Sequence, residues 1–468
     1  MSRAAVRRAL LALIVPALLP VSARAARPLW LGFSDRVFTS PQAQTWLHRS
    51  AQAGADIVRI DIGWVAPDTA TRPRGFNARN PSDPHYDFSH ADAAVRLAAV
   101  QGLRVLLTFT GAPQWAEGPG RPVDASPGSW RPDPGALADY GAALALRYSG
   151  HYPDPNHPGT MLPRVAAFQV WNEPNLDLYL SPQWDGGRPV AADIYRDMLN
   201  AFYRGAKSAD GRAVVVTAGT APFGDPPGGQ RIMPARFWRE VFCLRAIGGR
   251  LENGNCHDPV HFDVLAHHPY SVGPPTMAAL QPDDVSIPDL GKLTRVLRAA
   301  EHLGTALPRT DHPLWITEVS YDSRPPDPQG VPADEHAHWL EQTLADLWRQ
   351  GARVIIWDNV RDQPPIPSYA ATNQSGVYYL NGHAKPALGA YRFPLVAWRQ
   401  GRTAVEVWGR APAGGRLTLQ QHVGRGWVTL RTLGVRARTP FQVSVSLAGA
   451  ATIRAVAGSA ASLAWRVP

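Results

Sequence analysis

The segment RVAAFQVWNEPN, residues 164–175, decides how this chain is interpreted. Its first half is an apolar run with the length and branched side chains of a buried strand. Glu173 follows at once, and Pro174 stops the strand ladder because it has no backbone N–H. A carboxylate at the C-terminal end of a buried strand is typical of the catalytic face of a parallel α/β barrel. Trp171 and Asn172 add an apolar wall and a hydrogen-bonding neighbour, a setting that suits a proton-donating carboxyl.

Outward from this strand, strand-like and helix-like stretches alternate over about 365 residues. The eight predicted strands are 29–33, 57–62, 105–109, 164–170, 213–218, 262–266, 314–318 and 353–357. Predicted helices follow nearly all of them, at 40–53, 89–101, 134–148, 193–208, 236–247, 289–302 and 334–349. Eight such units predict a (β/α)8 TIM barrel with long βα loops. A doubly wound open sheet is the rival architecture, but it would not normally run to eight units, and no Gly-rich phosphate loop is present.

The pattern changes at about residue 393, where short alternating runs separated by Gly and Pro turns begin. These runs predict a small all-β sandwich. The expected organisation is a signal peptide at 1–25, a catalytic barrel at 26–393 and a β-sandwich accessory domain at 394–468. Tryptophans of a small sandwich fill its core more often than they stack on sugars, and this applies to Trp408, Trp427 and Trp465.

Composition places the chain among globular proteins and makes a nucleic-acid partner a poor candidate. Of its 468 residues, 45% are hydrophobic and 18% are charged, which is too apolar for a disordered chain. The net charge of +9 falls to +5 once the four arginines of residues 1–25 are removed. The remaining arginines are scattered instead of clustered, so they form no stripe for a phosphate backbone.

Residues 1–25 have the features of a signal peptide. The segment begins with three positive charges, at Arg3, Arg7 and Arg8. An apolar stretch follows at 9–19, and a cleavage site of the Ala-x-Ala type lies at Ala23-Arg24-Ala25. An N-terminal membrane anchor is the competing interpretation, but the apolar run is short for a bilayer span. We therefore expect a secreted protein that is extracellular, periplasmic or cell-wall associated, with no stable membrane insertion.

The only two cysteines, Cys243 and Cys256, both lie in the part expected to be exported. An oxidising compartment favours a disulfide between them over two free thiols. His257 and His261 stand nearby, but they make only a weak case for a metal site, since too few further ligands are present. We predict neither a metal nor a cofactor.

Glu318 supplies a second strand-end carboxylate, at the end of the predicted seventh strand. It would stand on the same barrel rim as Glu173, facing the mouth. Glycoside hydrolysis needs one protonated and one ionised carboxyl, and a gap of about 5 Å between them leads to retained configuration. The alternative for Glu318 is a surface ion pair.

The chain resembles the clan A retaining glycoside hydrolases over about residues 29–393. WNEPN at 171–175, VRIDIGW at 58–64 and PQWA at 113–116 are most similar to family 39. Family 5 is the near alternative, because HPY at 268–270 is similar to its motif after the sixth strand.

This resemblance implies roles for individual residues. Glu173 would be the acid/base and Glu318 the nucleophile of a double displacement. Asn172 would bind the 2-hydroxyl of the sugar, while Tyr270 and Arg59 would keep Glu318 ionised.

Strand periodicity adds candidates for binding substrate. Arg59 and Asp61 share one strand face, so both can point inward. His268 and Tyr270 likewise share a face, whereas His267 points away and is expected to fill the core.

Aromatic residues at or beyond the strand ends are candidates to stack on sugar rings. They are Trp64, Trp115, Trp130, Tyr179, Trp184 and Trp357. By analogy with the clan, Trp357 would form the floor of the site. Half or more of these rings are expected simply to pack under loops.

The leading interpretation is a secreted retaining glycosidase that cleaves a β-linked glycoside or polysaccharide without a cofactor. Within the same clan, an endo-acting polysaccharide hydrolase or a transglycosylase remains open, because loops 67–87 and 117–134 could wall an extended cleft or close a pocket. A catalytically inactive barrel that binds glycan is the alternative from another class. A metal-dependent barrel hydrolase is set aside, since 29–33 lacks a His-x-His.

Overall fold

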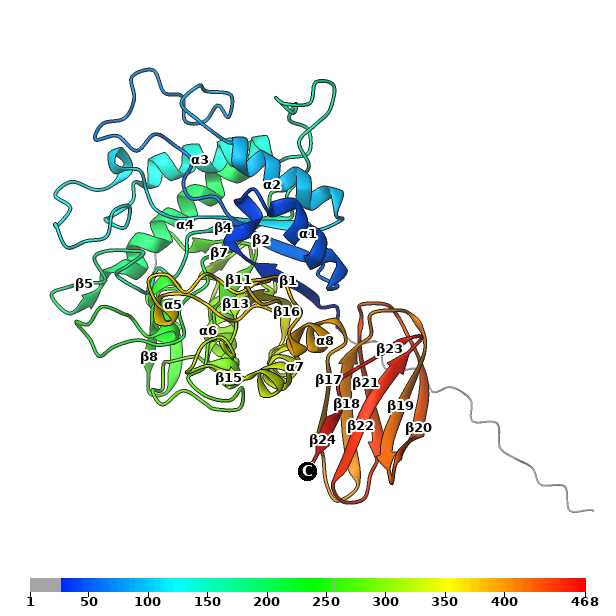
Figure 1. Ribbon diagram of the computed structural model, residues 1–468. Coiled ribbons are helices and arrows are strands. Elements are labelled where there is room, and N and C mark those ends of the chain that lie inside the picture. Colours follow the sequence, from blue (N-terminus) through cyan, green and yellow to red (C-terminus); the bar gives the residue numbers. More distant parts are fainter. Residues whose placement is uncertain (1–26, 256) are drawn as a thin grey trace, which may run out of the picture.

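Eight parallel strands form a ring at the centre of the molecule (Figure 1). The computed structural model describes residues 27–255 and 257–468. The strand order is β11-β13-β16-β1-β2-β3-β4-β7, and parallel bridges join Val216 to Val264 and Thr220 to His267, which closes the ring. The strands are β1 (Trp30–Ser34), β2 (Ile57–Asp61), β3 (Arg104–Phe109), β4 (Ala167–Val170), β7 (Val215–Thr217), β11 (Leu265–His267), β13 (Leu314–Val319) and β16 (Ala352–Asp358). The prediction of a (β/α)8 barrel is confirmed.

Helices surround the strand ring (Figure 1). Local signals set their ends: Asp133 caps the first turn of α3 through Ala136 N at 2.6 Å, and Gly304 ends α6 in a left-handed conformation with φ 72°. The helices are α1 (Ala43–Gln52), α2 (Ser89–Val100), α3 (Pro134–Arg147), α4 (Val190–Ala209), α5 (Pro234–Val241), α6 (Leu290–Leu303), α7 (Ala333–Arg349) and α8 (Pro386–Arg392).

Several predicted boundaries differ from the structure, and two of these differences have a clear local cause. The helix expected at 236–247 ends at Val241, because residues 244–253 form a hairpin of β8 (Leu244–Ile247) and β9 (Arg250–Asn253). The hairpin turns at Gly248-Gly249, whose positive φ values suit a tight turn between strands. The sixth barrel strand lies at 265–267 instead of 262–266, since Val260–His261 pairs outside the ring with Ala306–Leu307.

The inside of the barrel has an apolar layer below and a polar layer at the mouth. Side chains alternate between the barrel axis and the helices, as strand geometry requires. The apolar layer consists of Ile57, Leu106, Ala167, Val216, Val264, Ala266, Trp315, Val354 and Ile356. The next inward positions carry Arg59, Thr108, Gln169, His268 and Thr317, which are buried and hydrogen-bonded to one another. The barrel thus delivers its polar groups to one end.

The C-terminal part is an all-β domain with its own core. One sheet has the order β17-β18-β21, and the other has the order β20-β19-β22-β23, with β24 paired to β22. Its strands are β17 (Leu395–Arg399), β18 (Ala404–Arg410), β19 (Gly415–Val423), β20 (Gly426–Val435), β21 (Pro440–Ser446), β22 (Ala451–Ala457), β23 (Ala460–Ala461) and β24 (Trp465–Val467).

This domain stands beside α7 and α8 (Figure 1) and contacts the barrel away from its mouth. Arg410 is fully buried and pairs at 2.6 Å with Asp56, which precedes the N-terminal end of β2. Trp408 is also fully buried and faces Trp348 of α7, with ring centroids 5.9 Å apart. Trp408 therefore packs between the all-β domain and the barrel, and the prediction that it fills the core of the sandwich is wrong.

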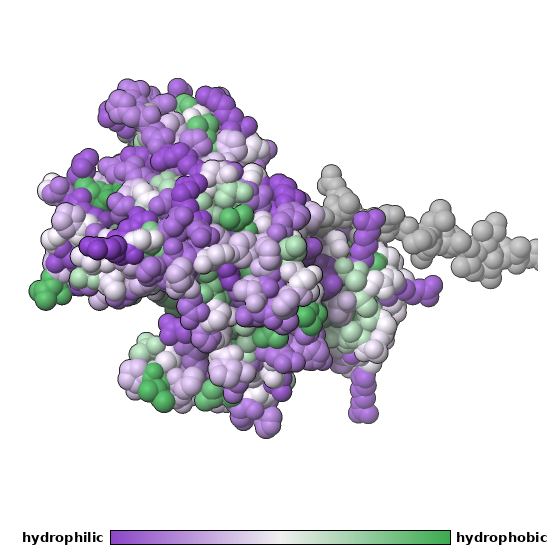
Figure 2. Space-filling view, turned by 90° about the horizontal axis from the view of Figure 1, so that it is seen from above, coloured by the Kyte–Doolittle hydropathy of each residue, from purple (hydrophilic) through white to green (hydrophobic). Residues whose placement is uncertain are grey.

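Two predicted features, the signal peptide at 1–25 and Cys256, fall outside the described residues. The cleavage site and the Cys243–Cys256 disulfide therefore stay predictions. Within residues 27–255 and 257–468, no helix combines the length and apolar character needed to cross a membrane. Figure 2 shows small, separate apolar patches on a largely hydrophilic face, as is usual for a globular protein.

Candidate active site

The chain turns sharply where β4 ends, and this turn places Glu173. Trp171 and Glu173 both adopt left-handed backbone conformations, with φ 80° and 38°. Such conformations are rare outside glycine and cluster at functional sites. Trp171 is fully buried, and its ring centroid lies 6.3 Å from that of Phe109. Asn172 faces the barrel mouth. The Glu173 backbone N–H donates to Gly219 O at 3.0 Å, which holds the turn.

A β-bulge in β13 places Glu318. Ile316 pairs with Ile355 and Val319 with Trp357, so three steps along β13 match two along β16. The extra residue lets Thr317 and Glu318 both face the mouth, while Val319 is buried. Bulges next to active sites commonly re-aim a side chain in this way.

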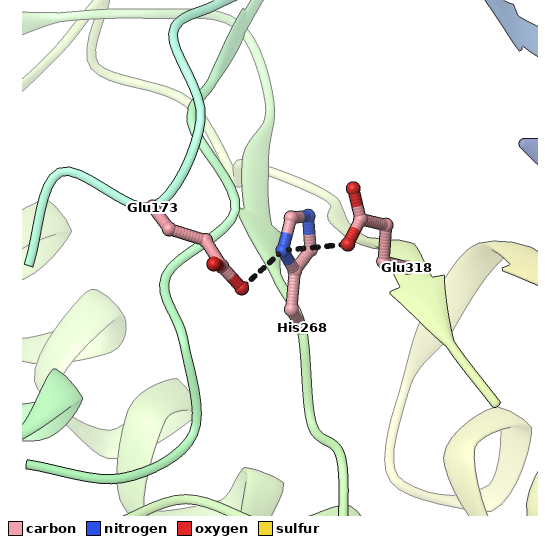
Figure 3. A group of neighbouring side chains, drawn as sticks. All are labelled: Glu173, His268 and Glu318. Carbon is pink, nitrogen blue, oxygen red and sulfur yellow. Dashed lines mark hydrogen bonds and ion pairs between the residues drawn. The ribbon is translucent and has the colours of Figure 1, made fainter. Parts of the chain in front are cut away.

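Glu173, His268 and Glu318 meet at the mouth (Figure 3). His268 Nδ1 lies 3.0 Å from Glu173 Oε1 and 3.5 Å from Glu318 Oε2. Each of the three side chains offers one atom that could bind a metal ion, and these three atoms lie within 4.8 Å of one another. A small cation could find ligands here, but the guanidinium of Arg59 already pairs with Glu318 and would repel a second positive charge.

Arg59 and Tyr270 hold the carboxyl of Glu318 from two sides. Arg59 Nη1 donates to Glu318 Oε1, and Tyr270 Oη donates to Glu318 Oε2 at 3.1 Å. Arg59 also donates through Nη2 to Asn172 Oδ1 at 2.9 Å. Burial acts to raise the pKa of Glu318, but His268, Arg59 and Tyr270 outweigh it and the pKa is lowered. Glu318 is therefore ionised at neutral pH.

A chain of buried hydrogen bonds orients His268. Gln169 Oε1 accepts from Arg59 Nε at 2.9 Å, so its amide Nε2 is the donor to Thr317 Oγ1, also at 2.9 Å. Thr317 Oγ1 in turn hydrogen-bonds His268 Nε2 at 2.9 Å, and the other ring nitrogen, Nδ1, lies 3.0 Å from Glu173 Oε1. Sequence reasoning missed Gln169 and Thr317, although both occupy inward positions of predicted strands.

A cavity of about 500 Å³ opens in front of Glu318. Its lining includes Asp35, Arg36, Arg59, Asp61, Thr110, Asn172, Tyr179, Glu318, Asp358, Asn359, Gln363 and Asn373. Asp358 is a neighbour of Glu318 that sequence reasoning overlooked. Burial and the charge of Glu318 raise the pKa of Asp358 well above its usual range, and Asn373 donates to its Oδ2 at 2.8 Å.

The prediction that Trp357 forms the floor of the site is wrong. Trp357 is fully buried, donates through Nε1 to Ser375 O at 2.7 Å, and does not line the cavity. Along β16 the inward positions are Val354, Ile356 and Asp358, so Trp357 faces the helices. Counting by two along this predicted strand would have found Asp358.

The other predicted aromatic residues divide between the cavity and the loops. Tyr179 lines the cavity, and burial followed by the charges of Glu173 and Glu318 raises its pKa to about 12. Trp64 is 7% exposed, stacks on Tyr140 at 5.3 Å and borders a separate cavity of about 360 Å³. Trp115 is half-buried and bonds through Nε1 to Pro67 O at 3.0 Å, under the loops.

Comparison with solved structures agrees with the fold. The chain is similar to a family 39 glycoside hydrolase from the gut symbiont Bacteroides cellulosilyticus WH2, with TM-score 0.54 and 17% identity over 90% of this chain and 81% of that one. It is also similar to a glucosidase from Croceicoccus marinus, with TM-score 0.54 and 13% identity over 92% of this chain and 95% of that one. No protein-family model matches the sequence, and no curated protein matches it significantly. The fold-level resemblance to family 39 expected from the sequence is confirmed.

Proposed function

We propose that this protein is a retaining glycoside hydrolase acting on a β-linked glycoside or polysaccharide. The observation that carries the proposal is the close approach of Glu173 and Glu318, whose facing atoms lie within 4.8 Å at the mouth of the barrel. Carboxyl groups about 5–5.5 Å apart suit a retaining mechanism, whereas inverting enzymes need about 6.5–9.5 Å to admit a water molecule.

In the first step Glu318 attacks the anomeric carbon of the sugar. The carbon–oxygen bond to the leaving group breaks as Glu173 gives its proton to that oxygen, and a glycosyl ester forms on Glu318. In the second step Glu173 takes a proton from water, whose oxygen attacks the same carbon. The ester bond breaks, Glu318 is released as a carboxylate, and the configuration is retained.

The surrounding groups match this division of roles. Arg59 and Tyr270 keep Glu318 ionised, as a nucleophile must be. His268 holds Glu173 Oε1, which leaves Oε2 to carry the proton toward the leaving oxygen. Asn172, fixed by Arg59 beside the cavity, is placed to bind the hydroxyl next to the anomeric carbon. A glycan-binding barrel without activity would not need an ionised Glu318.

Hydrolysis of 4-nitrophenyl β-glycosides and of plant and microbial polysaccharides tests the proposal. We expect turnover by the unaltered protein and none above background by E318Q, which keeps the size of the side chain. Transfer products in the presence of an added acceptor sugar would identify a transglycosylase instead. Glycan binding without turnover would identify an inactive barrel.

We also propose that the protein is exported, on the sequence features of residues 1–25. N-terminal sequencing of protein recovered outside the cytoplasm should find a start at or near Ala26. A membrane-bound species that retains Met1 would indicate an anchor instead.

A further inference from the structure

A second cavity adjoins the one in front of Glu318. It measures about 340 Å³ and is lined by Thr39, Asp61, Ile62, Val65, Asp87, His90 and Ala91. Thr39 and Asp61 also line the central cavity, so the two cavities share a wall. The 3-10 helix η1 (Arg36–Thr39), the end of β2 and the start of α2 enclose the second cavity.

Two polar side chains of this second cavity, Asp61 and His90, are available to a ligand, whereas Thr39 donates to Arg36 O and Asp87 accepts from Ser89 N. Asp61 Oδ1 accepts one bond, from Gly63 N at 3.0 Å, and no donor of the described chain reaches its other oxygen. His90 is exposed in the first turn of α2, and within the described residues its ring makes no hydrogen bond. Ile62 and Val65 supply apolar wall beside these groups. Hydroxyl partners next to apolar surface are what a pyranose ring requires.

A third cavity, of about 430 Å³, adjoins the central one through Asp35, Arg36 and Gln363, but most of its polar groups are occupied. Asp35 accepts the backbone N–H groups of three residues, namely Val37, Val360 and Arg361, at 2.9–3.2 Å. Asp362 is held by Lys385. This cavity therefore serves as a matched control.

The position of the second cavity relative to the two glutamates assigns its ligand. Glu318 lines the central cavity and Glu173 does not, so the leaving group departs on the side of Glu173 and His268, over β4 and β11. The second cavity lies at the end of β2, between η1 and the start of α2, away from the side of the mouth that carries Glu173 and His268. A sugar bound in the second cavity therefore belongs to the part of the substrate that becomes attached to Glu318, and not to the leaving group.

We propose that the second cavity binds a second sugar on the side of the glycan that becomes attached to Glu318, with Asp61 contacting both sugars. The inference rests on the proposed function and narrows it: the substrate is an oligo- or polysaccharide, and the enzyme releases units of at least two sugars from the attacked side.

The test compares 4-nitrophenyl glycosides of a disaccharide and of its monosaccharide, namely cellobioside with β-glucoside, xylobioside with β-xyloside and mannobioside with β-mannoside. For the pair that is cleaved, we expect kcat/KM to be at least ten-fold higher for the disaccharide, with free disaccharide appearing together with the chromophore. Equal or lower kcat/KM for the disaccharide would overturn the second subsite and leave the proposed function intact. Failure to cleave any glycoside or polysaccharide would overturn both.

Two variants locate the effect. H90W places a bulky ring in the second cavity and should reduce the disaccharide-to-monosaccharide ratio to near one. I366W fills the third cavity from a position that is also exposed, and it should keep the ratio of the unaltered enzyme. If I366W abolished the preference and H90W preserved it, the assignment to the second cavity would be wrong.

Discussion

Glu318 and Asp358 face one cavity from the neighbouring strands β13 and β16, and the protein drives their pKa values in opposite directions. Burial acts to raise the pKa of both carboxyls, but Arg59 and Tyr270 donate to Glu318 directly, whereas within the described residues Asn373 is the side chain that donates to Asp358. Glu318 therefore ionises at a lower pH than Asp358. Two carboxyls whose pKa values are driven apart in this way can take different roles within one site.

Replacing Asp358 with Asn tests this separation through the pH profile. Because Asp358 is already neutral where Glu318 titrates, D358N should leave the acidic limb of kcat/KM unchanged. Ionisation of Asp358 at high pH places a second negative charge beside Glu318, so D358N should retain more activity than the parent on the alkaline limb. A shift of the acidic limb by one pH unit or more would show that Asp358 is ionised with Glu318.

Azide distinguishes the roles of the two glutamates. E318A and E173A should each lose several orders of magnitude in turnover. With E318A, azide attacks the face left open by the nucleophile and yields an inverted glycosyl azide. With E173A and an activated phenol as leaving group, the ester still forms, and azide intercepts it to give a retained product. The opposite pair of configurations would mean that the roles are reversed.

Gly219 packs against the ring that positions Glu173. A Cβ at this position would lie 2.1 Å from His268 Nε2, so G219A must displace the imidazole. We expect kcat to fall by about 10- to 100-fold because Glu173 loses its orientation. The control is G211A, where no atom lies within 4 Å of the added Cβ. Unchanged kcat in G219A would show that His268 is not needed in its observed position.

Stability should depend on pH through Glu341 of α7. This carboxyl is fully buried, accepts Leu395 N at 3.3 Å, and has its pKa raised by burial to about 7. Since folding favours the protonated form, this contribution to stability is complete below about pH 4.5, the usual value for Glu, and is lost as the pH rises through about 7.

Urea unfolding of E341Q from pH 5 to 8 measures this contribution. At pH 8 the variant should exceed the parent in free energy of unfolding by on the order of 2 kcal/mol, because the neutral amide has no charge to bury. E335Q, an exposed change on the same helix, should behave like the parent. Parallel pH curves for E341Q and the parent would contradict the assignment.

Arg410 should secure the all-β domain to the barrel without affecting chemistry. R410A leaves Asp56 without its closest charge partner and should lower the free energy of unfolding by about 3 kcal/mol. The exposed change R466A should have little effect. Since no described residue beyond Asn373 lines the central cavity, kcat of folded R410A should equal that of the parent. Loss of kcat with the fold intact would place the domain in the active site.

Much of this protein could be predicted from local patterns. Eight strand–helix units predict the barrel, and Glu173 and Glu318 stand at the ends of two predicted strands, because strand periodicity and strand ends are properties of short segments. Along β16 the same rule places Asp358 inward and Trp357 outward, whereas analogy with related enzymes places Trp357 in the site.

The tertiary structure decided the rest. Counting by two along β13 places Glu318 with Ile316, facing the helices, and only the bulge opposite β16 turns it into the mouth. A bulge arises from register between two strands, so neither strand reveals it alone. The sequence by itself determined the barrel and the two candidate carboxylates. Their approach to within 4.8 Å, and the network that orients His268 between them, exist only because the closed ring brings β2, β4, β11 and β13 together.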